Sequence, residues 1–357
     1  MSQRQGSDRP DRKRGRRRWA LRVAAGVVCL ALGLAVGEAI CRVAVTPQPP
    51  VRFQQGAQVF DEDGLGRFFE KFEPDPDLFW RLAPDQTIAP GGGLTWRIIS
   101  NGQRLREDHE IPVPKPRDQM RQLFLGDSCT FGFGIPVQDT FVEQVEDNLR
   151  RSFPGKSIES VNAGVPAYTI YQGWRYLVRD GLELDPDVVL VCFGNNDRTT
   201  WDHMSDFEHH RRLMAIQPPG PLRWSRLCRL TWATLYGGTR KIMARPRLTT
   251  DEFRQLLGKI KDTTDERNIG LMIIVWVWRN QAMGSGPPTG SVYQRELIEF
   301  CEAESVPIVN LFGIMRQLCS DHPVGDVYLD QLHPTGKANA RIARTIAPAI
   351  ASWYRNR

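Results

Sequence analysis

Short apolar runs alternate with helix-like periodicity from about residue 119 to the C-terminus. Five runs are short, rich in β-branched residues and almost continuously apolar, which predicts buried parallel strands at 122–125, 158–162, 187–193, 271–276 and 307–311. Helices are predicted near 139–152, 169–180, 250–266, 291–303 and 335–354, the last with an apolar stripe of Ile342, Ile346, Ile350 and Trp353. This alternation predicts a three-layer α/β/α sandwich around about five parallel strands.

A separate apolar stretch, residues 19–45, follows a basic tail at residues 1–18, and Val23–Gly37 within it carries no charge. We predict a single-pass transmembrane signal anchor with a cytoplasmic N-terminus, which leaves the rest of the chain extracytoplasmic, in the periplasm or at the cell surface. A cleaved signal peptide is the alternative, because the uncharged core is short for a span and Ala35-Val36-Gly37 resembles a cleavage site.

The net charge of +6 and the isoelectric point near 9.0 do not indicate a nucleic-acid-binding surface. The first 18 residues alone hold eight Lys or Arg against Asp8 and Asp11. The other 339 residues balance at 39 basic and 39 acidic. The basic character therefore belongs to the N-terminal tail, and no nucleic-acid partner is expected.

Two regions interrupt the regular pattern. Residues 46–118 are rich in Pro, Gly and charge, and predict an irregular membrane-proximal segment with one short strand at 95–100 before the Asn101-Gly102 turn. Within the α/β domain at 119–357, residues 198–247 form an insertion rich in Trp and Arg. An insertion of this length after a strand end predicts a lid or a membrane-facing flap.

Polar motifs follow the predicted strands and precede the last helix. Gly126-Asp127-Ser128, Asn162-Ala163-Gly164 and Gly194-Asn195-Asn196-Asp197 each come at a strand end, and Asp330-Gln331-Leu332-His333-Pro334 precedes the last helix. Each motif alone is typical of a turn or a helix cap. Because the carboxyl ends of parallel strands meet at one edge of a sheet, we expect the four motifs to form one site.

Together these motifs supply the groups of an acyl-transfer site. Ser128 is the candidate nucleophile, His333 its general base and Asp330 the carboxylate that orients the imidazole. The backbone amides of Ser128 and Gly164 and the side-chain amide of Asn196 are candidate oxyanion donors. Neither a metal nor a cofactor is expected.

On these four motifs, in this order, the chain resembles the SGNH, or GDSL-type, esterase and acyltransferase superfamily over residues 119–357. The resemblance implies a flavodoxin-like fold, Ser128 as nucleophile, Asp330 and His333 as its partners, and an oxyanion hole of Ser128, Gly164 and Asn196. The single span and the Ser100-Asn101-Gly102-Gln103-Arg104 segment are also similar to membrane-anchored bacterial members. Cys129 after the serine departs from the pattern but removes no catalytic group.

Two competing sites are weaker. The spacing of His203, His209 and His210 with Asp202 and Asp206 fits no compact metal-ligand set, which favours solvated lid residues. Cys129 has no base placed for it, so it is not the expected nucleophile. Cys192, Cys228, Cys301 and Cys319 are expected as free buried thiols, although an oxidising compartment would permit a disulfide among them.

The sequence thus predicts an exported serine esterase acting on an ester of an envelope glycan or lipid, with O-acetyl groups as the first choice. A glycan O-acyltransferase would use the same residues and differ only in how water is excluded. A non-catalytic envelope assembly or glycan-binding protein is the alternative from another class.

Overall fold

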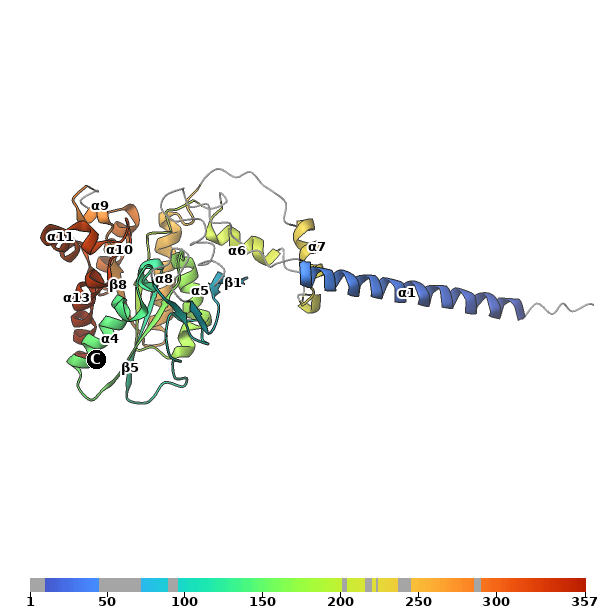
Figure 1. Cartoon of the computed structure of the whole chain (residues 1–357), viewed down its shortest axis with the longest axis horizontal. Coiled ribbons are helices and arrows are strands. Elements are labelled where there is room, and N and C mark those ends of the chain that lie inside the picture. The colour runs from blue at the N-terminus through green and yellow to red at the C-terminus, as the bar shows by residue number, and fades with distance from the viewer. Residues whose placement is uncertain are drawn as a thin grey trace, which may run out of the picture. The chain divides into compact units, whose positions relative to one another are not determined.

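The computed structural model of the protein describes residues 10–44, 72–88, 96–200, 204–215, 220–222, 224–236, 245–285 and 290–357 (Figure 1). The chain divides into two compact units, one of residues 1–48 with 211–240 and the other of residues 49–210 with 241–357. All seven cysteines are unpaired, but of the last four, which were expected as buried thiols, Cys192 and Cys301 are buried while Cys228 and Cys319 are partly exposed.

The larger unit is built on a parallel five-stranded sheet, as predicted. The strands are β5 (Gln119–Gly126), β6 (Ser157–Gly164), β7 (Val188–Cys192), β8 (Gly270–Val275) and β9 (Ile308–Asn310). Their order is β6-β5-β7-β8-β9, which is the flavodoxin-like arrangement. In the register, Gly126 pairs with both Gly164 and Cys192, so the carboxyl ends of the three strands lie level.

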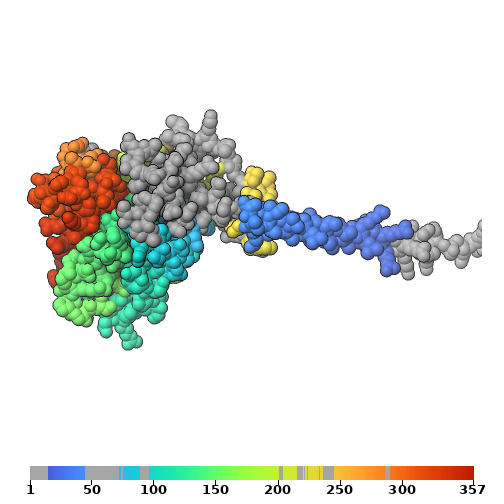
Figure 2. Space-filling model, in the orientation of Figure 1, coloured from blue at the N-terminus to red at the C-terminus, as the bar shows by residue number. Residues whose placement is uncertain are grey.

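Helices cover both faces of this sheet (Figure 1). α4 (Phe141–Ser152) packs with α13 (Gly336–Arg355), while α5 (Ile170–Arg179) packs with α8 (Thr250–Asp265), and α8 with α10 (Val292–Glu304). The predicted apolar stripe of α13 is buried at Ile342, Ile346 and Ile350. Figure 2 shows the C-terminal residues lying against those of the α4 region. The shorter helices are α3 (Ser128–Phe131), η1 (Val137–Asp139), η2 (Gly181–Leu184), α9 (Arg279–Ala282), α11 (Phe312–Asp321) and α12 (Val324–Val327).

Three helices begin with a reciprocal capping box, which explains where the sequence starts them. At α5 the Thr169 hydroxyl accepts a hydrogen bond from the Gln172 backbone amide, and the Gln172 side chain accepts one from the Thr169 backbone amide. Thr249 with Glu252 begins α8, and Ser291 with Gln294 begins α10, in the same way. Such caps satisfy amides that the first helical turn leaves without a partner.

The membrane-proximal segment is more ordered than predicted. It holds two antiparallel hairpins, β1 (Phe72–Asp75) with β2 (Phe79–Leu82) and β3 (Gln86–Ile88) with β4 (Ile98–Ser100). β4 lies within the strand predicted at 95–100, of which Thr95 lies outside the described residues. Leu82, Trp96 and Ile98 form a small core with Phe131 of α3, so the hairpins pack against the helix that begins at Ser128.

The smaller unit contains α1 (Pro10–Ala44) and α7 (Arg226–Tyr236). Residues Gly15–Ala44 of α1 are long and apolar enough to cross a membrane, with a mean hydropathy of 2.2 in the most apolar window. Glu38 accepts hydrogen bonds from Ser225 Oγ (2.8 Å) and from the backbone amides of Arg226 (3.0 Å) and Leu227 (2.9 Å). The predicted insertion at 198–247 therefore carries helices, namely α6 (Asp206–Ala215), η3 (Gly220–Leu222) and α7.

Candidate active site

Ser128, His333 and Asp330 lie in one hydrogen-bonded line. His333 Nε2 is 2.8 Å from Ser128 Oγ, and His333 Nδ1 is 2.7 Å from Asp330 Oδ2. The imidazole therefore joins the hydroxyl to the carboxylate, although the chain separates Ser128 from His333 by 205 residues. This arrangement can transfer a proton from the serine to the histidine, with the carboxylate fixing the imidazole tautomer.

The turn after β5 places Ser128 at the first position of the one-turn helix α3. Asp127 caps this helix, since its Oδ1 accepts a hydrogen bond from the Cys129 amide at 2.8 Å. The Ser128 amide has no acceptor among the described residues, as the first amides of a helix have no partner within it. The motif therefore caps α3 through Asp127 and can at the same time present Ser128 as a nucleophile.

Asp330 and His333 are held by the turn that joins them. Asp330 Oδ1 accepts from the backbone amides of Leu332 (2.7 Å) and His333 (2.8 Å). Burial opposes ionisation of Asp330, but the hydrogen bonds and charge of His333 outweigh it and lower the pKa of this carboxyl to about 2. Phe133 packs on the imidazole with 4.9 Å between ring centroids, which restricts its rotation.

The candidate oxyanion donors are not equally available. Asn196 Nδ2 is 3.1 Å from the Tyr168 carbonyl oxygen and 3.2 Å from Asp127 Oδ2, so it contacts the residue before Ser128 but already has acceptors. The Gly164 amide donates to Asn162 Oδ1 at 3.0 Å and is therefore occupied. A Cβ at Gly164 would collide with the backbone of α3, so close packing accounts for this glycine.

A neighbouring turn holds an amide that the sequence did not single out. Ala167 adopts a positive φ of 64°, which is unusual for a residue with a Cβ. Its N–H donates no hydrogen bond within the described part of the chain. The next residue, Tyr168, supplies the carbonyl that Asn196 contacts, so the Ala167 turn borders the same site.

A buried ion pair supports this turn from the base of the insertion. Arg247 and Asp206 are each about 1% exposed and are joined by two contacts, of 3.0 Å and 2.9 Å. Arg247 Nη1 also donates to the Ala167 carbonyl at 2.5 Å, and Nη2 to Gln172 Oε1 at 2.9 Å. Asp206 in turn accepts from the Thr169 hydroxyl at 2.6 Å. Sequence reasoning missed this pair because its members are 41 residues apart.

Two further residues of the third motif have structural roles. Asp197 accepts from the backbone amides of Ile170 (2.9 Å) and Gly194 (2.8 Å), and its burial raises its pKa to about 7. Asn195 donates to Asp127 Oδ2 at 3.0 Å and accepts from Trp278 Nε1 at 2.6 Å. Complete burial raises the pKa of Asp127 as well. These side chains tie the ends of β5, β7 and β8 together.

The histidines of the insertion do not behave as predicted. His209 is 8% exposed and packs edge-on against Phe79, and His210 hydrogen-bonds to Tyr171. Both are packed side chains and not solvated lid residues, because α6 begins beside the β1–β2 hairpin. His203 and Asp202 lie outside the described residues. Where side chains are described, none of the His, Cys, Asp or Glu gather in a group of three that could hold a metal.

Cys129 is poorly suited to act as a nucleophile. Complete burial raises the pKa of its thiol well above the usual value, and the nearby Asp127 charge adds to this. A buried thiol in such surroundings stays protonated and inert.

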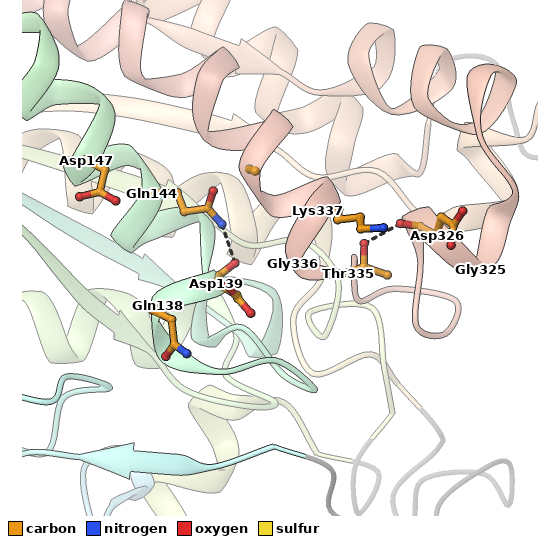
Figure 3. A pocket seen from close by; sticks show the side chains of 10 residues that line it. Gln138, Asp139, Gln144, Asp147, Gly325, Asp326, Thr335, Gly336 and Lys337 are labelled. Atoms are coloured by element: carbon orange, nitrogen blue, oxygen red, sulfur yellow. Dashed lines mark hydrogen bonds between the residues drawn. The ribbon is translucent and has the colours of Figure 1, made fainter.

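A hollow of about 630 Å³ lies between η1, α4 and the start of α13 (Figure 3). Figure 3 shows Asp139 and Asp147 on one side of it and Asp326 and Lys337 on the other. None of the three candidate catalytic side chains lines it. Acidic and basic side chains both line this hollow, so its charge does not indicate a class of ligand.

Solved structures with a similar fold include an acetyl xylan esterase, AlAXEase (TM-score 0.44, 15% identity, 65% of this chain and 100% of that chain). Another is the lipase/acylhydrolase from Enterococcus faecalis, with a TM-score of 0.41 and 20% identity over 65% of this chain and 96% of that chain. A third is the acetylxylan esterase Axe2 from Geobacillus stearothermophilus, with a TM-score of 0.44 and 17% identity over 65% of this chain and 94% of that chain. No curated protein matches the chain. The model of the GDSL-like lipase/acylhydrolase family matches residues 124–341, so the chain belongs to this family and is a hydrolase that acts on ester bonds.

Proposed function

We propose that the protein is a membrane-anchored, exported serine esterase that cleaves an acyl ester through an acyl-enzyme on Ser128. The observation that carries this proposal is the continuous contact from Asp330 through His333 to Ser128 Oγ, with distances of 2.7 Å and 2.8 Å. The lowered pKa of Asp330 keeps this carboxylate ionised at neutral pH, where it stabilises a protonated His333.

In the proposed reaction, Ser128 Oγ attacks the ester carbonyl while His333 Nε2 takes the hydroxyl proton. The tetrahedral intermediate collapses, and His333 returns that proton to the departing alcohol. Water then attacks the acyl-serine, with His333 taking its proton and giving it back to Ser128 Oγ. The products are the alcohol and the carboxylic acid, and no metal takes part.

The negative oxygen of the intermediate needs fixed donors. We assign two of them to the Ser128 amide and the Asn196 side chain, which exchanges an existing acceptor for the oxyanion. Gly164 would have to release Asn162 Oδ1 in order to take part. The Ala167 amide, unbonded within the described residues and in the adjoining turn, is therefore our third donor in place of Gly164.

The proposed location is the outer side of a membrane, with α1 as a retained anchor. Support comes from the length and apolarity of α1 and from the basic residues that precede it. A tethered, exported esterase reaches esters of the cell envelope, and the proposed substrate is an O-acyl, first an O-acetyl, ester of an envelope glycan. Lipid esters are the second candidate class.

The experiment measures acetate release from p-nitrophenyl acetate and from an O-acetylated glycan by the full-length protein in detergent. We expect Ser128→Ala and His333→Ala to lose nearly all activity, and Ser152→Ala, which changes an exposed serine in α4, to retain it. Full activity of Ser128→Ala contradicts the proposal. Acetyl transfer to an added acceptor glycan in preference to water would instead identify an O-acyltransferase.

A further inference from the structure

A cavity of about 310 Å³ is lined by Trp278, which follows β8, and by Arg198, which follows the third motif. Trp278 Nε1 donates to Asn195 Oδ1 at 2.6 Å, and Asn195 Nδ2 donates to Asp127 Oδ2 at 3.0 Å. Two hydrogen bonds thus connect the cavity wall to the residue before Ser128. The wall of the cavity is thus tied to the strand ends that carry the proposed catalytic residues.

Arg198 is the first of two cations in the lining of the cavity. It comes directly after Asp197 in the third motif, and its guanidinium lies over the Trp278 ring, 4.0 Å from the centroid. Among the residues that the structure describes, it makes no hydrogen bond or ion pair with a carboxylate. Partial burial lowers the pKa of Arg198, as expected for a cation that lacks a close counter-charge.

Arg295 is the second cation, and the neighbouring polar side chains already hydrogen-bond to other groups of the protein. One of its nitrogens, Nη1, donates to the Gly290 carbonyl at 3.2 Å, which leaves the rest of the guanidinium for a ligand. Tyr293 Oη donates to the Leu248 carbonyl at 2.5 Å, and Gln281 Nε2 donates to Gln294 Oε1 at 2.8 Å. No carboxylate lines the cavity among the described residues. Two guanidinium groups therefore set its charge.

We propose that this cavity binds a carboxylate carried by the alcohol part of the substrate, so that the natural substrate is an ester of an acidic carbohydrate. The inference rests on the proposed esterase function and specifies its substrate. Guanidinium groups match carboxylates in shape and charge, and form hydrogen bonds about twice as strong as neutral ones. The aromatic walls of Trp278 and Tyr293 suit a sugar ring.

The size and lining of the cavity favour a sugar acid over a phospholipid. Its volume is at the lower end of the range of about 300–1,000 Å³ that is usual for small-molecule pockets, which suits one ring-sized group. The acyl chains of a phospholipid need an extended aliphatic groove. Val292 is the one aliphatic side chain larger than alanine in the lining among the described residues.

The test measures hydrolysis of two acetylated polymers by the full-length protein in detergent. O-Acetylated polygalacturonate supplies carboxylates, O-acetylated xylan is the neutral polymer, and p-nitrophenyl acetate reports the chemical step. The variants are Arg198→Gln and Arg295→Gln, with Arg267→Gln as the control, an arginine outside the cavity whose side chain is 50% exposed. We expect Arg198→Gln to lower kcat/KM on the acidic polymer by about ten- to a hundredfold, mainly through KM, as for a lost charge-assisted hydrogen bond.

Activity of Arg198→Gln on p-nitrophenyl acetate should stay within about twofold of the wild type, and the control should match the wild type on every substrate. Equal activity of wild type and both cavity variants on the acidic polymer overturns the inference, as does an equal loss on both polymers. A loss confined to hydrolysis of phosphatidylglycerol micelles would identify an anionic lipid and refute the carbohydrate. If Ser128→Ala keeps its esterase activity, the proposed function itself fails, whatever the arginine variants do.

Discussion

Replacement of Arg247 by Met tests the structural support of the active site. The change keeps an apolar stem of similar length but removes the charge that compensates Asp206, and both side chains are about 1% exposed. Asp206 would retain the Thr169 hydroxyl as a donor, at 2.6 Å, while the Ala167 carbonyl and Gln172 Oε1 would each lose the donor that Arg247 provides. Breaking a buried ion pair in this way costs about 3–5 kcal/mol.

That cost is a large part of the total stability of about 5–15 kcal/mol that is usual for a folded domain. Unfolding by guanidinium chloride, followed by tryptophan fluorescence on the full-length protein in detergent, measures it. The matched variant is Arg247→Met with Asp206→Leu, which removes both charges together and should recover most of the loss. A cost below about 1 kcal/mol for Arg247→Met, or a double variant no more stable than the single one, would show that the ion pair does not support the active site in this way.

Three other predictions follow from the site, the core and the anchor. Asp330→Asn removes the charge that orients and stabilises His333, so kcat on p-nitrophenyl acetate should fall by roughly a thousandfold; a loss below tenfold contradicts this role. Burial raises the pKa of Glu146 to about 7 from 4.5, so its contribution to stability is complete below pH 4.5 and is lost as the pH rises through 7. Glu146→Gln should therefore flatten the fall in Tm between pH 5 and pH 8, and an unchanged slope would argue against a buried, protonated carboxyl. If α1 is a retained anchor, the intact mass of membrane-bound protein includes residues before Gly37, whereas a mature chain that begins at Glu38 would show a cleaved signal.

The sequence predicted the sheet and its main helices because each depends on local pattern. The central strands are short, apolar and mostly buried, completely so along β7, and their composition marks them clearly. The final helix was equally clear from its stripe of Ile342, Ile346 and Ile350, which are completely buried. β4 lies within the predicted strand at 95–100, but β1, β2 and β3 were missed because strands of three or four residues leave little periodicity.

The site was predictable where the chemistry is concentrated in motifs and not where it depends on distant contacts. Ser128, Asp330 and His333 were named from the sequence, and the structure brings them together. The bond from the Gly164 amide to Asn162 could not be read from a motif, because it depends on a side-chain rotamer. Burial of His209 was missed for a similar reason, since it packs against Phe79 of β2, which is distant in the sequence.

The proposed function depends on Ser128 as the nucleophile of an acyl-transfer site. Its most direct measurement is labelling of the full-length protein by a fluorophosphonate, followed by mass spectrometry of the modified peptide. We expect one adduct, on Ser128, which is absent from Ser128→Ala, strongly reduced in His333→Ala and unchanged in Ser152→Ala. Labelling of Ser128→Ala at the wild-type level, or a wild-type adduct on another residue, would contradict it.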